Sequence, residues 1–146
     1  MTTIAESRLR PHAAVRFAGP EHGFDLAGTV AALRTEAHPA SQGHRQKTLY
    51  RHGALTLAVF AFDPGAELAD HQANGVVTIQ CLDGALNVHT AEHTYELAPS
   101  GLVVLAPGVR HGVRAGKDAP AAMLLGVCRT ESDAAPTADV KGTRSR

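Results

Sequence analysis

The sequence predicts an all-β fold, a double-stranded jelly-roll β-barrel preceded by one short helix. Short segments in which apolar and polar residues alternate recur from about residue 46 to residue 129. Turn signals rich in glycine and proline separate these segments. Many short strands at regular spacing, joined by such turns, are typical of antiparallel barrels. The 146 residues are enough for one domain with its own core.

The segment before the barrel predicts an arm and a helix. Residues 1–23 mix arginine, proline, histidine and glycine with little periodicity, which predicts an extended or partly disordered N-terminal arm. Apolar side chains then recur at helical spacing, Asp25 can cap the first turn, and Pro39 ends the pattern. We therefore predict a short helix within 25–37 and assign 24–45 to this helix and the loop after it.

The barrel segment, residues 46–129, divides into strands at its turn signals. One strand, 54–62, is apolar on both alternating faces, so both faces should be buried. One face would meet the barrel core and the other could meet a second subunit. Polar residues with alanine, proline and threonine follow the barrel, and 130–146 is predicted to be a disordered tail. The predicted strands are 47–52, 54–62, 67–71, 76–82, 85–90, 93–97, 102–106, 109–114 and 121–128.

Composition excludes several classes of partner. The chain has 14 basic and 14 acidic residues and a formal net charge of zero, which gives no electrostatic case for nucleic acid or an anionic membrane as a partner. No apolar run is long enough to cross a bilayer or to act as a secretory signal, so we expect a cytoplasmic protein. Both cysteines, Cys81 and Cys128, lie in apolar strands, which predicts two buried thiols in a reducing compartment.

Two short segments carry the residues best suited to chemistry. In the first, five residues separate Gly65 from His71, and Gly84 closes the segment. In the second, a strand that begins after a glycine leads through the Pro-Gly turn at 107–108 to His111. Imidazole titrates near neutral pH and binds metals, so both histidines are candidates for ligand binding, proton transfer or metal coordination.

These segments resemble the two motifs of the cupin superfamily, and the resemblance covers about residues 46–129. The first cupin motif reads glycine, five residues, His, one residue, His, three or four residues, Glu, six residues, glycine. Gly65, His71 and Gly84 fit it, whereas Ala73 stands at the second His position and Val77 at the Glu position. The His of the second motif matches His111, with its proline out of place by one residue.

The resemblance implies that His71 and His111 meet inside the barrel mouth and line a ligand pocket with Ala73 and Val77. It also implies that a metal, if one binds, is iron, manganese, nickel or zinc at His71 and His111. Only two of the four cupin ligands are present, while a catalytic metal usually takes three protein ligands. We expect His89 at a hairpin tip facing water, and none of the other polar residues nearby is a persuasive third ligand.

Three functions stay open at this point. We favour the binding of a small organic molecule in the barrel, with no chemical activity assigned. The alternative is a metal-dependent oxygenase or isomerase acting on a small organic substrate. The third is a structural or regulatory homodimer, since the resemblance implies pairing through the outer sheet. Because a fold does not fix a function, the sequence leaves open whether the protein is an enzyme.

Overall fold

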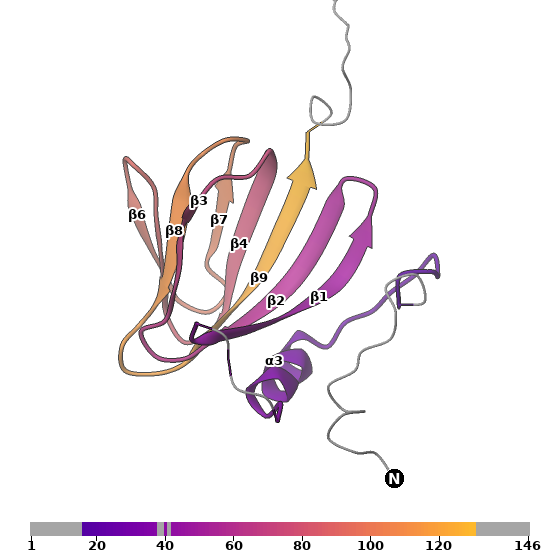
Figure 1. Ribbon diagram of the computed structural model, residues 1–146, viewed down its shortest axis with the longest axis horizontal. Helices are drawn as coiled ribbons and strands as arrows, with labels where there is room; N and C mark the ends of the chain where they lie inside the picture. Colours follow the sequence, from indigo (N-terminus) through magenta and orange to yellow (C-terminus); the bar gives the residue numbers. More distant parts are fainter. Residues whose placement is uncertain (1–15, 38–39, 41, 131–146) are drawn as a thin grey trace, which may run out of the picture.

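A computed structural model describes residues 16–37, 40 and 42–130 of the chain. Residues 131–146 of the predicted tail and residues 1–15 of the predicted arm lie outside these described residues. The described chain forms two antiparallel sheets that face each other, with one helix outside them (Figure 1). The all-β jelly-roll prediction with a short helix is therefore confirmed. No helix in the described residues is long and apolar enough to cross a membrane.

The two sheets have non-sequential strand orders, as a jelly roll requires. The five-stranded sheet has the order β1-β2-β9-β4-β7, and the four-stranded sheet has the order β3-β8-β5-β6. Each sheet therefore contains strands from both halves of the chain. The strands are β1 (His44–His52), β2 (Leu55–Phe62), β3 (Glu67–His71), β4 (Gly75–Asp83), β5 (Leu86–His89), β6 (Thr94–Leu97), β7 (Leu102–Leu105), β8 (His111–Ala115) and β9 (Ala121–Arg129).

The main core lies between the sheets and follows from alternation along the strands. Alternate residues of β4 point inward and are buried, while their neighbours are more exposed. This removes aliphatic and aromatic surface from water, at about 25 cal/mol per Å² of apolar area buried. The fully buried members of this cluster include Phe62, Ile79, Leu86, Val88, Val113 and Met123.

The predicted helix is present as α3 (Leu26–Arg34), and the side chain of Asp25 caps it by accepting a hydrogen bond from the Gly28 amide. It ends at Arg34, ahead of the proline expected to stop it. The helix packs on the outer face of β1 and β2, where its buried residues form a second apolar cluster with the sheet. That cluster comprises Val30, Leu33, Leu49, Val59, Ala61 and Ala122.

This packing corrects one prediction about the doubly apolar strand. The outward side chains of Val59 and Ala61 are covered by α3, so they offer no surface to a second subunit. The most exposed apolar side chains of the same sheet lie on its edge strand β7, where Leu102 is 57% and Val104 is 60% exposed. The homodimer stays a prediction, which light scattering at micromolar concentration can test.

Two further expectations need correction. Strand β1 begins at His44, inside the predicted loop, because a polar segment pairs with β2 as an edge strand and hydrogen bonding does not require an apolar pattern. Of the two cysteines, Cys81 is buried but Cys128 is exposed. Cys128 lies near the end of β9, and the second cluster under α3 contains residues from the opposite end of that strand.

Candidate functional site

The two motif histidines lie side by side on neighbouring strands. His71 is the last residue of β3 and His111 the first of β8, and they are paired in the antiparallel register. Their ring centroids are 4.4 Å apart and the rings are tilted by 57°. His111 is only 1% exposed, whereas His71 is open to solvent. The pair therefore joins a buried imidazole to an accessible one.

A β-bulge in β3 aims His71 into the barrel. Leu68 faces Val113 and His71 faces His111, so Ala69 and Asp70 together stand opposite a single residue of β8. In a regular strand, residues three apart point to opposite faces. The extra residue restores His71 to the inward face on which Leu68 packs against the core. Strict alternation along the sequence would have pointed these two side chains to opposite faces.

An aspartate–histidine pair lies on the outer face of this bulge. His89 on β5 lies with its Nε2 2.7 Å from Oδ1 of Asp70 on β3, across the intervening strand β8. The residue of β8 beneath them is Gly112, where an added Cβ would lie 2.4 Å from Asp70 Oδ1 and 2.5 Å from His89 Nε2. His89, expected to face water, is thus half-exposed and tied to the bulge.

Replacing Gly112 with alanine is expected to separate Asp70 from His89, at a cost of about 1 kcal/mol. The pair is surface-exposed, so its own contribution lies near the usual 0.2–1 kcal/mol for such pairs. Urea unfolding of Gly112→Ala, His89→Gln and the double variant checks this. If the methyl group acts through the pair, the double variant should cost no more than the larger single one. Fully additive costs would show that the added methyl group does not act through the pair.

Both imidazoles are held by backbone carbonyls two residues earlier in the chain. His71 Nδ1 is 3.1 Å from the Ala69 carbonyl oxygen, and His111 Nδ1 is 3.0 Å from that of Val109. A carbonyl oxygen can only accept a hydrogen bond, so each Nδ1 must carry a proton and donate it. In the neutral rings the Nε2 atoms are then lone-pair acceptors, available to a ligand.

Burial keeps His111 neutral over a wider pH range. Desolvation lowers its pKa below the ordinary histidine value, and the nearby His71 acts in the same direction. The hydrogen bond to the Val109 carbonyl and the charge of Asp70 oppose this but are smaller effects. At neutral pH, His111 therefore presents an uncharged imidazole.

Two apolar residues stand at positions where the cupin motifs carry metal ligands. Val77, at the position of the cupin glutamate, is 3% exposed and belongs to the core cluster, and Ala73 packs against the same cluster. The Ala73 carbonyl accepts a hydrogen bond from the Gly108 amide at 2.9 Å, which joins the two motif segments. At the two positions where the resemblance places further ligands, this chain has the methyl group of Ala73 and the isopropyl group of Val77.

Solved structures with the same architecture identify the fold. An RmlC-like cupin from Shewanella frigidimarina superposes with a TM-score of 0.57 at 18% identity, covering 65% of this chain and 84% of that chain. A cupin superfamily protein from Desulfitobacterium hafniense gives 0.58 at 13% identity, covering 67% and 88%. This chain has the cupin fold. A conserved protein of unknown function from Streptococcus pyogenes gives 0.59 at 25% identity, covering 76% and 91%.

The similarity is one of fold, since no protein-family model and no curated protein sequence matches the chain. The metal site implied by the cupin motifs does not fit the residues present. Within residues 16–37, 40 and 42–130, no three His, Cys, Asp or Glu side chains are grouped so that they could hold a metal ion. Asn74 directly follows Ala73, which stands at the position of the second cupin histidine, and its side chain is exposed. A two-imidazole site falls short of the three protein ligands usual for a catalytic metal.

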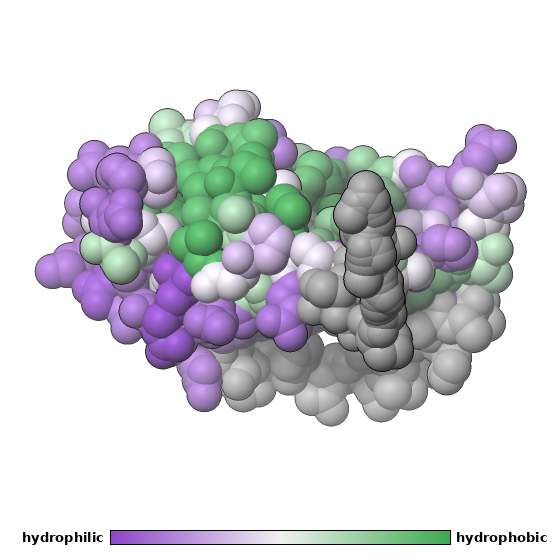
Figure 2. Space-filling model, turned by 90° about the horizontal axis from the view of Figure 1, so that it is seen from above, coloured by the Kyte–Doolittle hydropathy of each residue, from purple (hydrophilic) through white to green (hydrophobic). Residues whose placement is uncertain are grey.

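The barrel end that carries the histidines is partly apolar at its surface. Strand β9 ends there beside the start of β4, and β3 leads into β4 at the same end. Seen from this side, a compact apolar area is bordered by hydrophilic residues (Figure 2). Small-molecule sites usually combine such apolar surface with a few well-placed polar groups.

Proposed function

We propose that this cupin-fold protein binds a small organic molecule at the barrel end that carries His71 and His111. The observation that supports this is the pair of adjacent imidazoles, each oriented by a backbone carbonyl through Nδ1. Their Nε2 atoms are left to a ligand, and the resemblance places the apolar residues Ala73 and Val77 in the same pocket. Ordered polar groups in an apolar setting are what ligand recognition needs.

The protonation of His111 points to the chemistry of the ligand. Neutral imidazoles accept hydrogen bonds at Nε2, so the preferred ligand carries hydroxyl or N–H donors. A carboxylate would need a protonated imidazole, which burial disfavours at His111. We therefore propose an uncharged hydroxyl compound or an amine rather than an organic acid.

A metal-dependent oxygenase or isomerase is the second candidate. Histidines that bind metals usually donate their other ring N–H to a carbonyl or carboxylate, and both imidazoles here do so. The pair would supply two nitrogen ligands to iron, manganese, nickel or zinc. This candidate would need a third ligand in addition to His71 and His111, and no group of three or more such side chains that could hold a metal occurs in the described residues.

Two measurements on purified, tag-free protein separate these candidates. The first is elemental analysis after incubation with iron, manganese, nickel and zinc. We expect far less than one metal per chain. About one metal per chain, lost in a His71→Ala, His111→Ala variant, would favour the metal-dependent enzyme.

The second measurement is ligand-detected NMR with mixtures of polyols, amines and organic acids. Hydroxyl compounds or amines should bind the parent, and their binding should be lost in the double variant. Because His111 is buried, the single His71→Ala variant is the test if the double variant unfolds. A His52→Ala, His93→Ala variant is the matched control, since it removes two exposed imidazoles. Equal binding by the parent and the His71 variants would contradict the proposal.

A further inference from the structure

Asp70, in the bulge of β3, is contacted from two other segments of the chain. Its side-chain Oδ1 lies 2.7 Å from Nε2 of His89 on β5, the strand beyond β8. Its backbone carbonyl oxygen lies 3.5 Å from Nη2 of Arg110, which immediately precedes β8. A bulge interrupts the regular ladder of backbone hydrogen bonds, so contacts of this kind decide where the bulged residues rest.

The contact between Asp70 and His89 depends on the glycine of the strand between them. Neighbouring strands lie about 4.8 Å apart, so side chains on β3 and β5 can meet only if no side chain on β8 stands between them. Gly112 pairs with His89 in the register, and a Cβ added there would collide with both partners. Glycine at this position therefore leaves the space in which the pair forms.

The bulge decides which face of the sheet His71 occupies. In a regular register, Asp70 would stand opposite His111 on the inner face, and His71 would follow on the outer face. In the bulged register, Asp70 lies outward over Gly112, and His71 lies inward. A change of one residue in the register would thus exchange an imidazole for a carboxylate at the barrel site.

We propose that Asp70 and His89 are positioning residues that keep β3 in its bulged register and so hold His71 inward. They act through the backbone of β3, because their contact lies on the outer face of the sheet. The same bulge supplies the Ala69 carbonyl that orients the ring of His71 through Nδ1 at 3.1 Å. The consequence for binding rests on the ligand site proposed above, whereas the position of the imidazole can be measured without a ligand.

The carboxylate of Asp70 favours the bulged register for two physical reasons. Outside the barrel it pairs with His89, and an exposed pair of this kind changes an equilibrium constant by up to about fivefold. In the regular register it would face inward, next to the apolar core that Leu68 and Val113 join, where a charge loses much of its hydration. Both effects disfavour the register in which His71 points outward.

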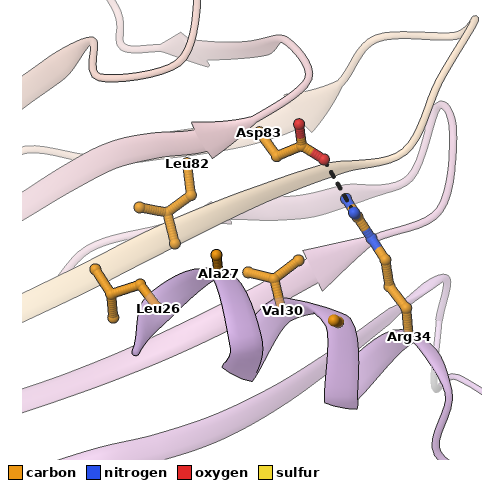
Figure 3. Close-up of a pocket in the computed structure, with 7 residues that line it drawn as sticks. Leu26, Ala27, Val30, Arg34, Leu82 and Asp83 are labelled. Carbon is orange, nitrogen blue, oxygen red and sulfur yellow. Dashed lines mark hydrogen bonds and ion pairs between the residues drawn. The ribbon is translucent and has the colours of Figure 1, made fainter. Parts of the chain in front are cut away.

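Two other exposed ion pairs serve as matched controls, because neither involves the bulge. Glu67 of β3 pairs with Arg114 of β8 on the same strand pair, at a point where the register is regular. At the opposite end of the barrel, Arg34 of α3 reaches Asp83 at the end of β4 (Figure 3). Removing either pair should leave the orientation of His71 unchanged.

NMR of the imidazole rings tests the proposal on the full-length protein without a ligand. At about pH 8, imidazole side chains are mostly neutral, and the nitrogen chemical shifts of a ring report which nitrogen carries the proton. In the parent, we expect His71 to be protonated at Nδ1 and to show an NOE to the ring of His111. Asp70→Ala should raise the ratio of outward to inward His71 at least about fivefold. This weakens the NOE and moves the nitrogen shifts towards those of the exposed His93.

His89→Leu removes the pair but keeps the carboxylate, so it should give a smaller change in the same direction. Asp70→Asn keeps an oxygen acceptor for His89 and should largely retain the inward ring. Glu67→Gln and Asp83→Asn should leave His71 as in the parent, and circular dichroism establishes that each variant is folded. An unchanged His71 in Asp70→Ala, or an equal change in Glu67→Gln, would overturn the proposal. If His71 moves in Asp70→Ala but the parent binds no hydroxyl compound or amine, the positioning role stands and only the ligand proposal fails.

Discussion

Replacing Gly84 with alanine is expected to destabilise the protein by about 2–5 kcal/mol. Gly84 follows β4 with φ of +72°, in the left-handed region where a Cβ is disfavoured by about 1–2 kcal/mol. An added Cβ would also lie 2.3 Å from the Pro120 carbonyl oxygen and 3.0 Å from the Ala121 Cα. Both atoms are backbone, so β4 and β9 would have to move apart, which adds a strain term of about 1–3 kcal/mol.

Gly65 offers a matched control within the same motif. Its φ is +74°, but a Cβ there would meet nothing within 4 Å. Gly65→Ala should therefore cost only the conformational part, about 1–2 kcal/mol. Urea unfolding followed by circular dichroism gives both free energies. Equal costs for the two substitutions would mean that the contact with the Pro120 carbonyl does not constrain the turn.

Stability is expected to fall below about pH 6.5 because of His111. Burial lowers its pKa in the folded protein below the value of 6.5 expected for the unfolded chain. As the pH falls through 6.5, the unfolded chain binds this proton first, so the free energy of unfolding decreases. The loss is at most about 1.4 kcal/mol per pH unit for one proton, and it continues down to the folded pKa. Above about pH 6.5, the contribution of the neutral His111 imidazole to the free energy of unfolding is fully present.

Urea unfolding of the parent and of His111→Leu between pH 5 and pH 8 isolates the effect. In His111→Leu, the free energy of unfolding should change less with pH, because the contribution of one buried imidazole to that pH dependence is removed. His93→Leu is the matched control, because it removes an exposed imidazole from the hairpin between β5 and β6. The same change of slope in both variants would contradict the assignment to His111.

At His71, the alternation pattern along the strand and the observed strand pairing give opposite directions for the side chain. The cupin resemblance implies that His71 and His111 meet, and their rings lie 4.4 Å apart. Alternation from Leu68 would have turned His71 outward, and only the bulge opposite Gly112 restores it. A bulge depends on how the residues of one strand pair with those of its neighbour. The sequence of the bulged strand alone does not carry that information.

The sequence by itself determined the features that depend on neighbouring residues. Alternation marked the inward faces of β4, the side chain of Asp25 marked the start of α3, and positive-φ turns fell at the motif glycines. Each is a local property, because side-chain direction, capping and turn conformation are decided within a few residues.

Only the tertiary structure decided what depends on contacts between distant segments. It placed α3 over Val59 and Ala61, left Cys128 exposed, and brought Arg34 to Asp83, 49 residues further along the chain. An apolar or charged side chain does not specify which distant surface will cover or pair with it. That choice follows from the packing of the helix and the two sheets as a whole, where burial of the largest apolar area sets the arrangement.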